Sequence, residues 1–143
     1  DASAQTFSST STFEGGGALQ FSGGAIENSP YQYDTAATIG TLEGHWNGTS
    51  AAGPTVAVGV SANGSFALIE GSCTATGTLH PRGSGKNVFD LSVTFGASPC
   101  AMANETATGI AVAYPLTTTG QMQLIAAVVS QSRDKGMAFF AVQ

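Results

Sequence analysis

The stretch Asn87-Val-Phe-Asp-Leu-Ser-Val-Thr-Phe95 decides the fold class of this chain. Large apolar residues occupy every second position along it, and Val88, Asp90, Ser92 and Thr94 fill the positions between. Because successive side chains of a β-strand point to opposite faces of the sheet, this alternation predicts a strand with one face in a core and the other toward water. The core face comprises Phe89, Leu91, Val93 and Phe95.

Similar segments follow one another at short spacing from residue 38 to the C-terminus, separated by turn residues. Asn63-Gly64 predicts a tight hairpin, because a type I′ turn needs positive φ at both central positions. Short connections of this kind predict an all-β domain: an eight-stranded antiparallel meander that forms a barrel or a barrel-like sandwich. The expected strands cover residues 38–46, 55–62, 65–70, 73–80, 87–95, 105–114, 121–129 and 136–142.

The same alternation predicts which side chains face the core. The inward positions are expected to be Leu42, Trp46, Val56, Val58, Val60, Phe66, Leu68, Phe89, Leu91, Val93, Phe95, Ile110, Val112, Tyr114, Met122, Leu124, Ala126, Val128, Phe140 and Val142. The positions that face away are mostly small residues such as Ala57, Gly59, Ala111, Ala113 and Ala127. An outer face so poor in charge could be covered by the N-terminal segment or by a partner, or could form a smooth, Thr-rich exterior.

Residues 1–37 differ from the rest of the chain, because they are rich in Gly, Ser and Thr and offer little apolar area to bury. Only residues 18–21 resemble a strand, and Phe7 and Phe13 could dock onto a neighbouring surface. We therefore predict a flexible arm over residues 1–37, which could add one edge strand, and a barrel domain over residues 38–143.

The composition limits the classes of partner. Of the 143 residues only 9% are charged, and the formal net charge is −5 with no basic stripe, so nucleic-acid binding is not expected. The longest apolar run, residues 124–129, is too short to span a bilayer, and the aromatic girdles of an outer-membrane barrel are missing, so no membrane-spanning segment is expected. The low charge and small side chains are typical of an exported β protein. The opening Asp1-Ala-Ser-Ala would fit a processed product, and a removed signal peptide, with or without a lipid-bearing cysteine, is a hypothesis.

Cys73 and Cys100 are the two cysteines of the chain. In the predicted meander Cys73 begins the fourth strand and Cys100 follows the fifth, so both lie at the same end of the sheet, across one hairpin. Since a disulfide needs Cα atoms within roughly 7 Å, this topology predicts a Cys73–Cys100 disulfide. The alternative is a pair of buried free thiols.

No catalytic or metal-binding constellation is visible. His45 and His80 have no metal-ligand spacing, and the one acidic neighbour on a shared strand face is Glu43, beside His45. The chain has no Gly-x-Ser-x-Gly elbow and no calcium-loop pattern. We therefore expect no enzyme, no catalytic residues, no cofactor and no metal. The sequons at Asn47, Asn63 and Asn104 fit glycosylation, and the first two also fit Asn-Gly turns.

The stretch Gly44-His-Trp46-Asn-Gly48, followed by residues 56–60 and Asn63-Gly64, resembles the opening of a calycin barrel. Lipocalins, avidins and small bacterial protease inhibitors share a Gly-x-Trp on the first strand, where the Trp closes one end of the barrel. A core Trp in any β domain would give the same short pattern. The resemblance implies two functions: a carrier of a small apolar ligand, or a periplasmic protease inhibitor that uses its N-terminal arm. Biotin-type sites use several aromatic residues, whereas this chain has a single Trp.

Over residues 38–143 the chain is also similar to small exported proteins of β-proteobacteria, secreted or lipid-anchored, and in particular to an uncharacterised Burkholderia family of exported antigens. The similarity rests on the composition, on the spacing of the expected strands along the sequence and on the cysteine pair. It implies a periplasmic or outer-membrane-surface location, recognition by host antibodies, and an envelope or host protein as partner, and it transfers no catalytic residues. The expected function is that of a non-enzymatic envelope protein that acts by binding or surface display, as a monomer.

Overall fold

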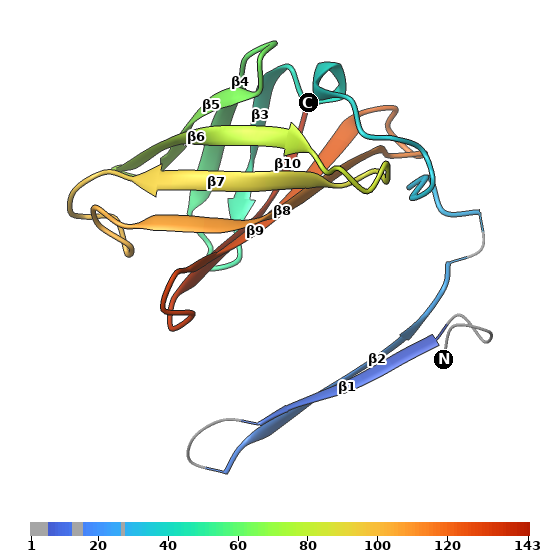
Figure 1. The fold of residues 1–143 in the computed structure, drawn as a ribbon, viewed down its shortest axis with the longest axis horizontal. Helices are drawn as coiled ribbons and strands as arrows, with labels where there is room; N and C mark the ends of the chain where they lie inside the picture. Colours follow the sequence, from blue (N-terminus) through green and yellow to red (C-terminus); the bar gives the residue numbers. More distant parts are fainter. Residues whose placement is uncertain (1–5, 13–15, 27) are drawn as a thin grey trace.

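The computed structural model describes residues 6–12, 16–26 and 28–143. Eight antiparallel strands form a closed barrel, and a separate two-stranded hairpin precedes it (Figure 1). Each barrel strand pairs with the next in sequence, which confirms the predicted meander, and the last strand pairs with the first, so the sheet is a closed barrel and not an open sandwich. The hairpin consists of β1 (Thr6–Thr12) and β2 (Ala18–Gly24); the barrel consists of β3 (Gly44–Ser50), β4 (Thr55–Val60), β5 (Ser65–Glu70), β6 (Cys73–Pro81), β7 (Phe89–Phe95), β8 (Thr106–Pro115), β9 (Met122–Ser130) and β10 (Gly136–Val142).

The barrel core is built from the inward side chains of all eight strands. Trp46 is fully buried, and its indole N–H donates a hydrogen bond of 2.8 Å to the carbonyl of Leu42, so the polar end of the ring is satisfied inside the core. The inward residues of β4, β5 and β7 are those that the alternation predicts. The interior of an eight-stranded barrel is just wide enough for its own side chains to fill it.

The predicted facing of β8 and β10 is wrong. Ile110, Val112 and Tyr114 of β8, and Phe140 and Val142 of β10, point outward, and the positions between them point inward. Ala111 is 1% exposed, whereas Ile110 is 43% exposed. The physical reason is volume: large side chains on β3, β4, β5 and β7 already occupy the close-packed interior, so the strands opposite contribute mostly small ones. The inward residues of these two strands are Ala107, Ala111, Ala113, Phe139 and Ala141.

The first barrel strand is also displaced from its predicted range of 38–46. A 3₁₀ turn, η1 (Ile39–Thr41), comes first, and β3 begins only at Gly44, whose φ of +123° favours glycine. The strand then runs through Asn47-Gly48, which is therefore not a turn. A Cβ at Gly48 would lie 1.8 Å from the carbonyl oxygen of Phe140, so glycine allows β3 and β10 to approach and close the barrel.

The hairpin connection at Asn63-Gly64 is present, but its predicted type I′ geometry is wrong. Gly64 has a φ of +83°, whereas Asn63 does not have a positive φ. The turn is closed by a hydrogen bond of 2.8 Å from the amide of Gly64 to the carbonyl of Ser61. The Asn63 side chain accepts a hydrogen bond from the amide of Ser65, which stabilises the start of β5.

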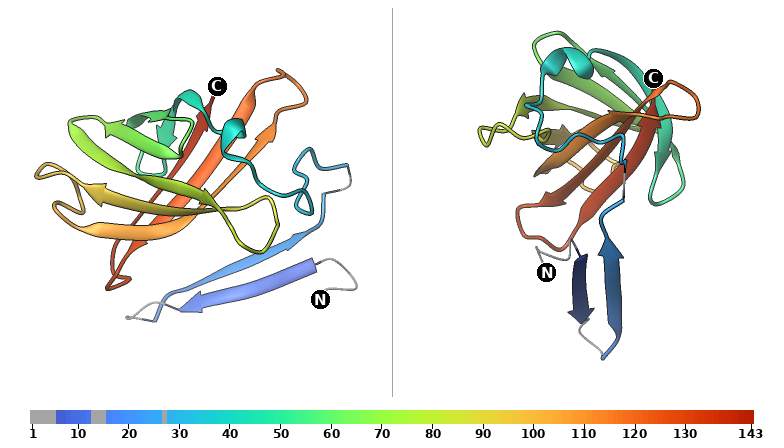
Figure 2. Two further views of the ribbon diagram at one scale, coloured as in Figure 1. Left: turned by 45° about the horizontal axis from the view of Figure 1, so that its top comes forward. Right: turned by 90° about the vertical axis from the view of Figure 1, so that its right-hand side faces the viewer.

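The N-terminal segment forms two strands paired with each other over seven positions, instead of one strand added to the barrel. The hairpin stands clear of the barrel wall (Figure 2). Phe7 lies against Gly23 of the opposite strand, whereas Phe13 lies outside the described residues. The flexibility of the arm and the domain boundary after residue 37 stay predictions.

The segment between the hairpin and the barrel is held against the loop between β6 and β7. The amide of Asn87 donates to the carbonyl of Tyr33 at 3.0 Å, and the Tyr31 hydroxyl donates to the carbonyl of Asn87. Lys86 forms an ion pair of 2.7 Å with Asp34. These contacts fix the point at which the hairpin leaves the barrel.

Candidate binding surfaces

The Cys73–Cys100 disulfide forms as predicted, with a Cα–Cα distance of 4.7 Å, and the alternative of free thiols is wrong. Both cysteines are buried at one end of the barrel. Nearby, the amide of Gly96 donates to the carbonyl of Thr74, and the amide of Asn104 donates to the carbonyl of Gly96. The disulfide therefore anchors the connection between β7 and β8 to the start of β6.

A hollow of about 320 Å³ lies at this end of the barrel. Its apolar lining includes Phe95, Met102 and Met137, and Glu70 is among its polar residues. The Ser50 hydroxyl, in a residue that also lines the hollow, is buried and has no hydrogen-bond partner within the described protein. A buried hydroxyl without a partner costs free energy, so this position favours a small polar group beside it. The volume is at the lower limit of ligand pockets.

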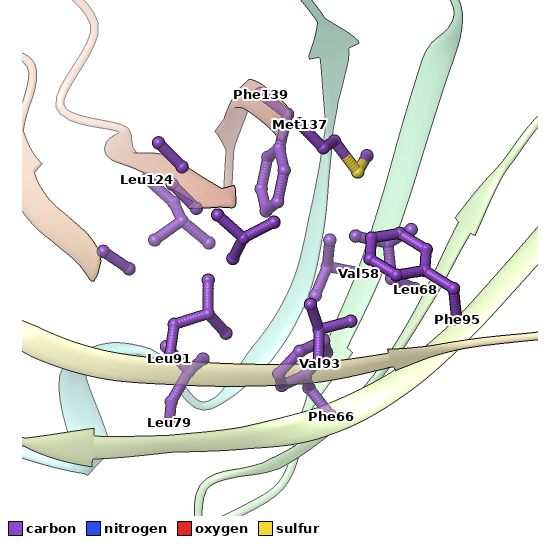
Figure 3. A pocket seen from close by; sticks show the side chains of 14 residues that line it. Val58, Phe66, Leu68, Leu79, Leu91, Val93, Phe95, Leu124, Met137 and Phe139 are labelled. Carbon is purple, nitrogen blue, oxygen red and sulfur yellow. The ribbon is translucent and has the colours of Figure 1, made fainter. Parts of the chain in front are cut away.

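The barrel interior itself holds no comparable space. The cavity between the inward side chains is about 20 Å³, which suffices for one water molecule. The fourteen side chains that line it are apolar, and the only heteroatom among them is the Met137 sulfur (Figure 3). The Phe and Val side chains therefore fill the centre of the barrel.

The two histidines are not brought together. His45 lies on the outer side of β3 beside Gly59, and His80 lies opposite Asp90 on the outer side of β6. Strands β4 and β5 separate the two strands in the barrel order. Across residues 6–12, 16–26 and 28–143 no group of three His, Cys, Asp or Glu side chains could hold a metal ion.

The most distinctive surface is the outer face of strands β8, β9 and β10, which we call the outer β8–β10 face. Across the three strands, the register places Val112, Ile125 and Phe140 in one row. Ile110, Val129 and Phe140 are 43%, 47% and 49% exposed. None of the outward positions on these strands carries a charged side chain. The outward residues are Thr106, Thr108, Ile110, Val112, Tyr114, Gln123, Ile125, Ala127, Val129, Gly136, Ala138, Phe140 and Val142.

Sequence reasoning noted that the outward positions lack charge and could be covered by the N-terminal segment or a partner. It missed the exposed apolar residues because it placed the large side chains of β8 and β10 inside the barrel. One end of the face is covered by the segment after the hairpin: the rings of Tyr31 and Tyr114 meet edge to face with centroids 6.0 Å apart. Burial, with a smaller contribution from the nearby Tyr33, raises the pKa of the Tyr31 hydroxyl.

Charged side chains lie instead in the loops, on β7 and at the end of β5. Arg82 pairs with Asp90 at 2.6 Å, and Lys135 pairs with Glu105. In the loop between β9 and β10, hydrogen bonds from the Ser132 and Ser130 hydroxyls hold the pKa of the Asp134 carboxyl below its usual value. These pairs neutralise charge locally and leave the outer β8–β10 face neutral.

A second exposed apolar surface lies on the hairpin. The register pairs Phe7 with Gly23 and Ser9 with Phe21, which places both aromatic rings on the same face of the ribbon. Phe7 is 60% exposed and Phe21 is 46% exposed. Neither strand of the hairpin contains a charged residue.

Comparison with protein families, with curated proteins and with solved structures finds no match to this chain. Among the described residues, no helix has the length and apolar character needed to cross a membrane. The resemblances to calycins and to exported Burkholderia antigens therefore stay predictions.

Proposed function

We propose that this chain is a non-enzymatic exported protein of the bacterial envelope, which acts by binding or surface display through the outer β8–β10 face. The observation that carries the proposal is the exposure of Ile110, Val129 and Phe140 on three neighbouring strands without a charged residue between them. Contiguous exposed apolar patches mark interaction sites. The filled barrel then serves as a rigid scaffold for this surface.

The disulfide supports export, because disulfides form and persist in oxidising compartments. The low content of charged residues, 9%, agrees with the same location. Recognition by host antibodies is part of the proposal, since a rigid barrel presents fixed surface epitopes.

Location and redox state in the natural host test this proposal. Intact cells, and cells with a permeabilised outer membrane, are treated with a membrane-impermeant amine reagent, and free thiols are alkylated. We expect Lys86 and Lys135 to be labelled without lysis of the inner membrane, and Cys73 and Cys100 to resist alkylation. Labelling only after complete lysis, together with two reactive thiols, would contradict export.

The hollow beside Ser50 favours one second candidate, a small-ligand carrier that binds at the end of the barrel instead of in its centre. Native mass spectrometry of the protein purified from its host distinguishes the carrier from the binding or display function. We expect the mass of the chain alone, whereas a stoichiometric small molecule that is lost in Ser50→Ala would favour the carrier. Protease inhibition by the N-terminal arm stays a prediction from resemblance.

A further inference from the structure

We infer that the outer β8–β10 face binds the β1–β2 hairpin of a second copy of this chain, so that two copies exchange hairpins in a reciprocal dimer. The inference deepens the proposed function by naming a partner for that face, and it rests on the face being a binding surface. It departs from the monomer expected from the sequence.

The hairpin needs a surface on which to pack. A two-stranded ribbon is only marginally stable in water unless its apolar face is supported. Phe7 and Phe21 lie on one face of this ribbon and are both largely exposed, whereas the opposite face carries polar residues such as Ser8, Thr10 and Ser22. The ribbon is therefore amphipathic, and its apolar side is open.

The two surfaces match in charge as well as in polarity. Each copy carries a formal net charge of −5, so contact between charged surfaces of two copies would be opposed by repulsion. The hairpin strands and the outer β8–β10 face contain no charged side chain. Over these strands two acidic copies can meet without bringing like charges together; Glu14, the one acidic residue between β1 and β2 in the sequence, lies outside the strands.

The tether fits an exchange between copies. Tyr31 is held against Tyr114 at the end of β8, and the hairpin that precedes it lies clear of its own barrel wall (Figure 2). In a pair related by a two-fold axis, each hairpin would lie on the face of the other copy, and the same contact would occur twice.

The area of the hairpin contact determines how strong the dimer is expected to be. Strands of seven residues make a ribbon about 24 Å long and about 10 Å wide, which covers roughly 240 Å² on each surface. Two such contacts bury about 1,000 Å² in total, at the low end of specific interfaces. The dimer should therefore be weak, populated in concentrated solution and dissociated in dilute solution.

Sedimentation equilibrium of the whole chain, from micromolar to millimolar concentration, tests dimer formation. We expect a reversible monomer–dimer equilibrium that salt does not weaken, because the contact is apolar. A hairpin variant (Phe7→Asp with Phe21→Asp) and a face variant (Val129→Asp with Phe140→Asp) should each weaken it at least about tenfold. Ile69→Asp is the matched control, because Ile69 is 52% exposed on β5, outside this face, and its dimer constant should stay within about twofold.

A mixing experiment identifies the exchange. The ¹⁵N-labelled face variant keeps an intact hairpin, and the unlabelled hairpin variant keeps an intact face, so the mixture retains one of the two contacts. We expect the amide signals of residues 6–12 and 18–24 to shift on mixing. The absence of a shift at millimolar concentration of both variants would overturn the inference, and it is the result expected for a face-to-face dimer, in which the hairpin takes no part. A hairpin docked on its own barrel is distinguished by sedimentation, because it leaves the parent chain monomeric at every concentration.

Other outcomes are equally decisive. Dimerisation that is lost in the face variant but kept in the hairpin variant would overturn the hairpin as the occupant and leave the face as a binding surface. A monomer at every concentration would overturn the inference, whereas the proposed export is decided separately by lysine labelling and thiol alkylation in cells.

Discussion

Removing the disulfide tests whether it stabilises the barrel by as much as the length of the loop that it closes implies. The bridge joins residues separated by 27 positions, Cys73 and Cys100, and thereby restricts the unfolded chain. The chain-entropy relation for a loop of this length gives about 12 cal/mol/K, or about 3.5 kcal/mol at 25 °C. The double variant Cys73→Ala, Cys100→Ala should therefore lose about 3 to 4 kcal/mol of unfolding free energy.

Urea unfolding followed by circular dichroism measures this loss. The dependence on urea should also steepen, because the unfolded chain without the bridge exposes more surface. A reducing agent should lower the stability of the parent chain and leave the double variant unchanged, which serves as the control. A loss below about 1 kcal/mol in a folded double variant would refute the loop-closure reasoning.

Three further measurements test the core and the loops. Ala111→Leu should cost about 1 to 3 kcal/mol of stability by overpacking the interior, whereas Ile110→Thr on the outer side, which keeps a β-branched side chain, should change it by less than about 1 kcal/mol; equal effects in urea unfolding would contradict the observed facing of β8. Trp46→Phe should cost about 1 to 3 kcal/mol or more in the same assay, because it leaves the buried Leu42 carbonyl without its donor as well as removing volume, and a neutral result would contradict that role. The pKa of Asp134 is lower in the folded chain than in the unfolded chain, so its stabilising contribution is present above the unfolded pKa and is lost as the pH falls through the folded pKa. Asp134→Asn should therefore be less stable than the parent near neutral pH. The difference in unfolding free energy between the two chains should disappear in acid.

Strand positions and the disulfide could be predicted because they depend on local patterns. In β7 the residues between the apolar ones are polar, so the alternation defines both the strand and its inward face. Cys73 and Cys100 flank the β6–β7 hairpin, so the order of strands alone brings them to one end of the barrel. Such features need no knowledge of the rest of the core.

The facing of β8 and β10 could not be predicted locally. Both faces of β8 are apolar along Ile110-Ala111-Val112-Ala113, and β10 has two adjacent aromatic residues, Phe139 and Phe140. The sequence pattern therefore indicates strands but does not indicate which side of each strand faces the core. The choice depends on the volume left by side chains from the other strands, which is a property of the closed barrel. The hairpin was missed for a different reason: β1 is a run of Ser and Thr with one aromatic residue, and its pairing with β2 produces the amphipathic ribbon.

The outward side of β6 shows that the apolar character of the outer β8–β10 face is not a requirement of the fold. Thr74, Thr76 and Thr78 occupy the outward positions of β6, in the same barrel and with the same pairing geometry. Threonine is favourable in a β-strand and exposes little apolar area at these positions. On β8 and β10 the corresponding positions carry Ile110 and Phe140, whose exposure in the single chain leaves hydrophobic stabilisation unrealised. Since folding does not need these side chains outside, their placement is best explained by a contact outside the barrel, which is the basis for assigning binding to this face.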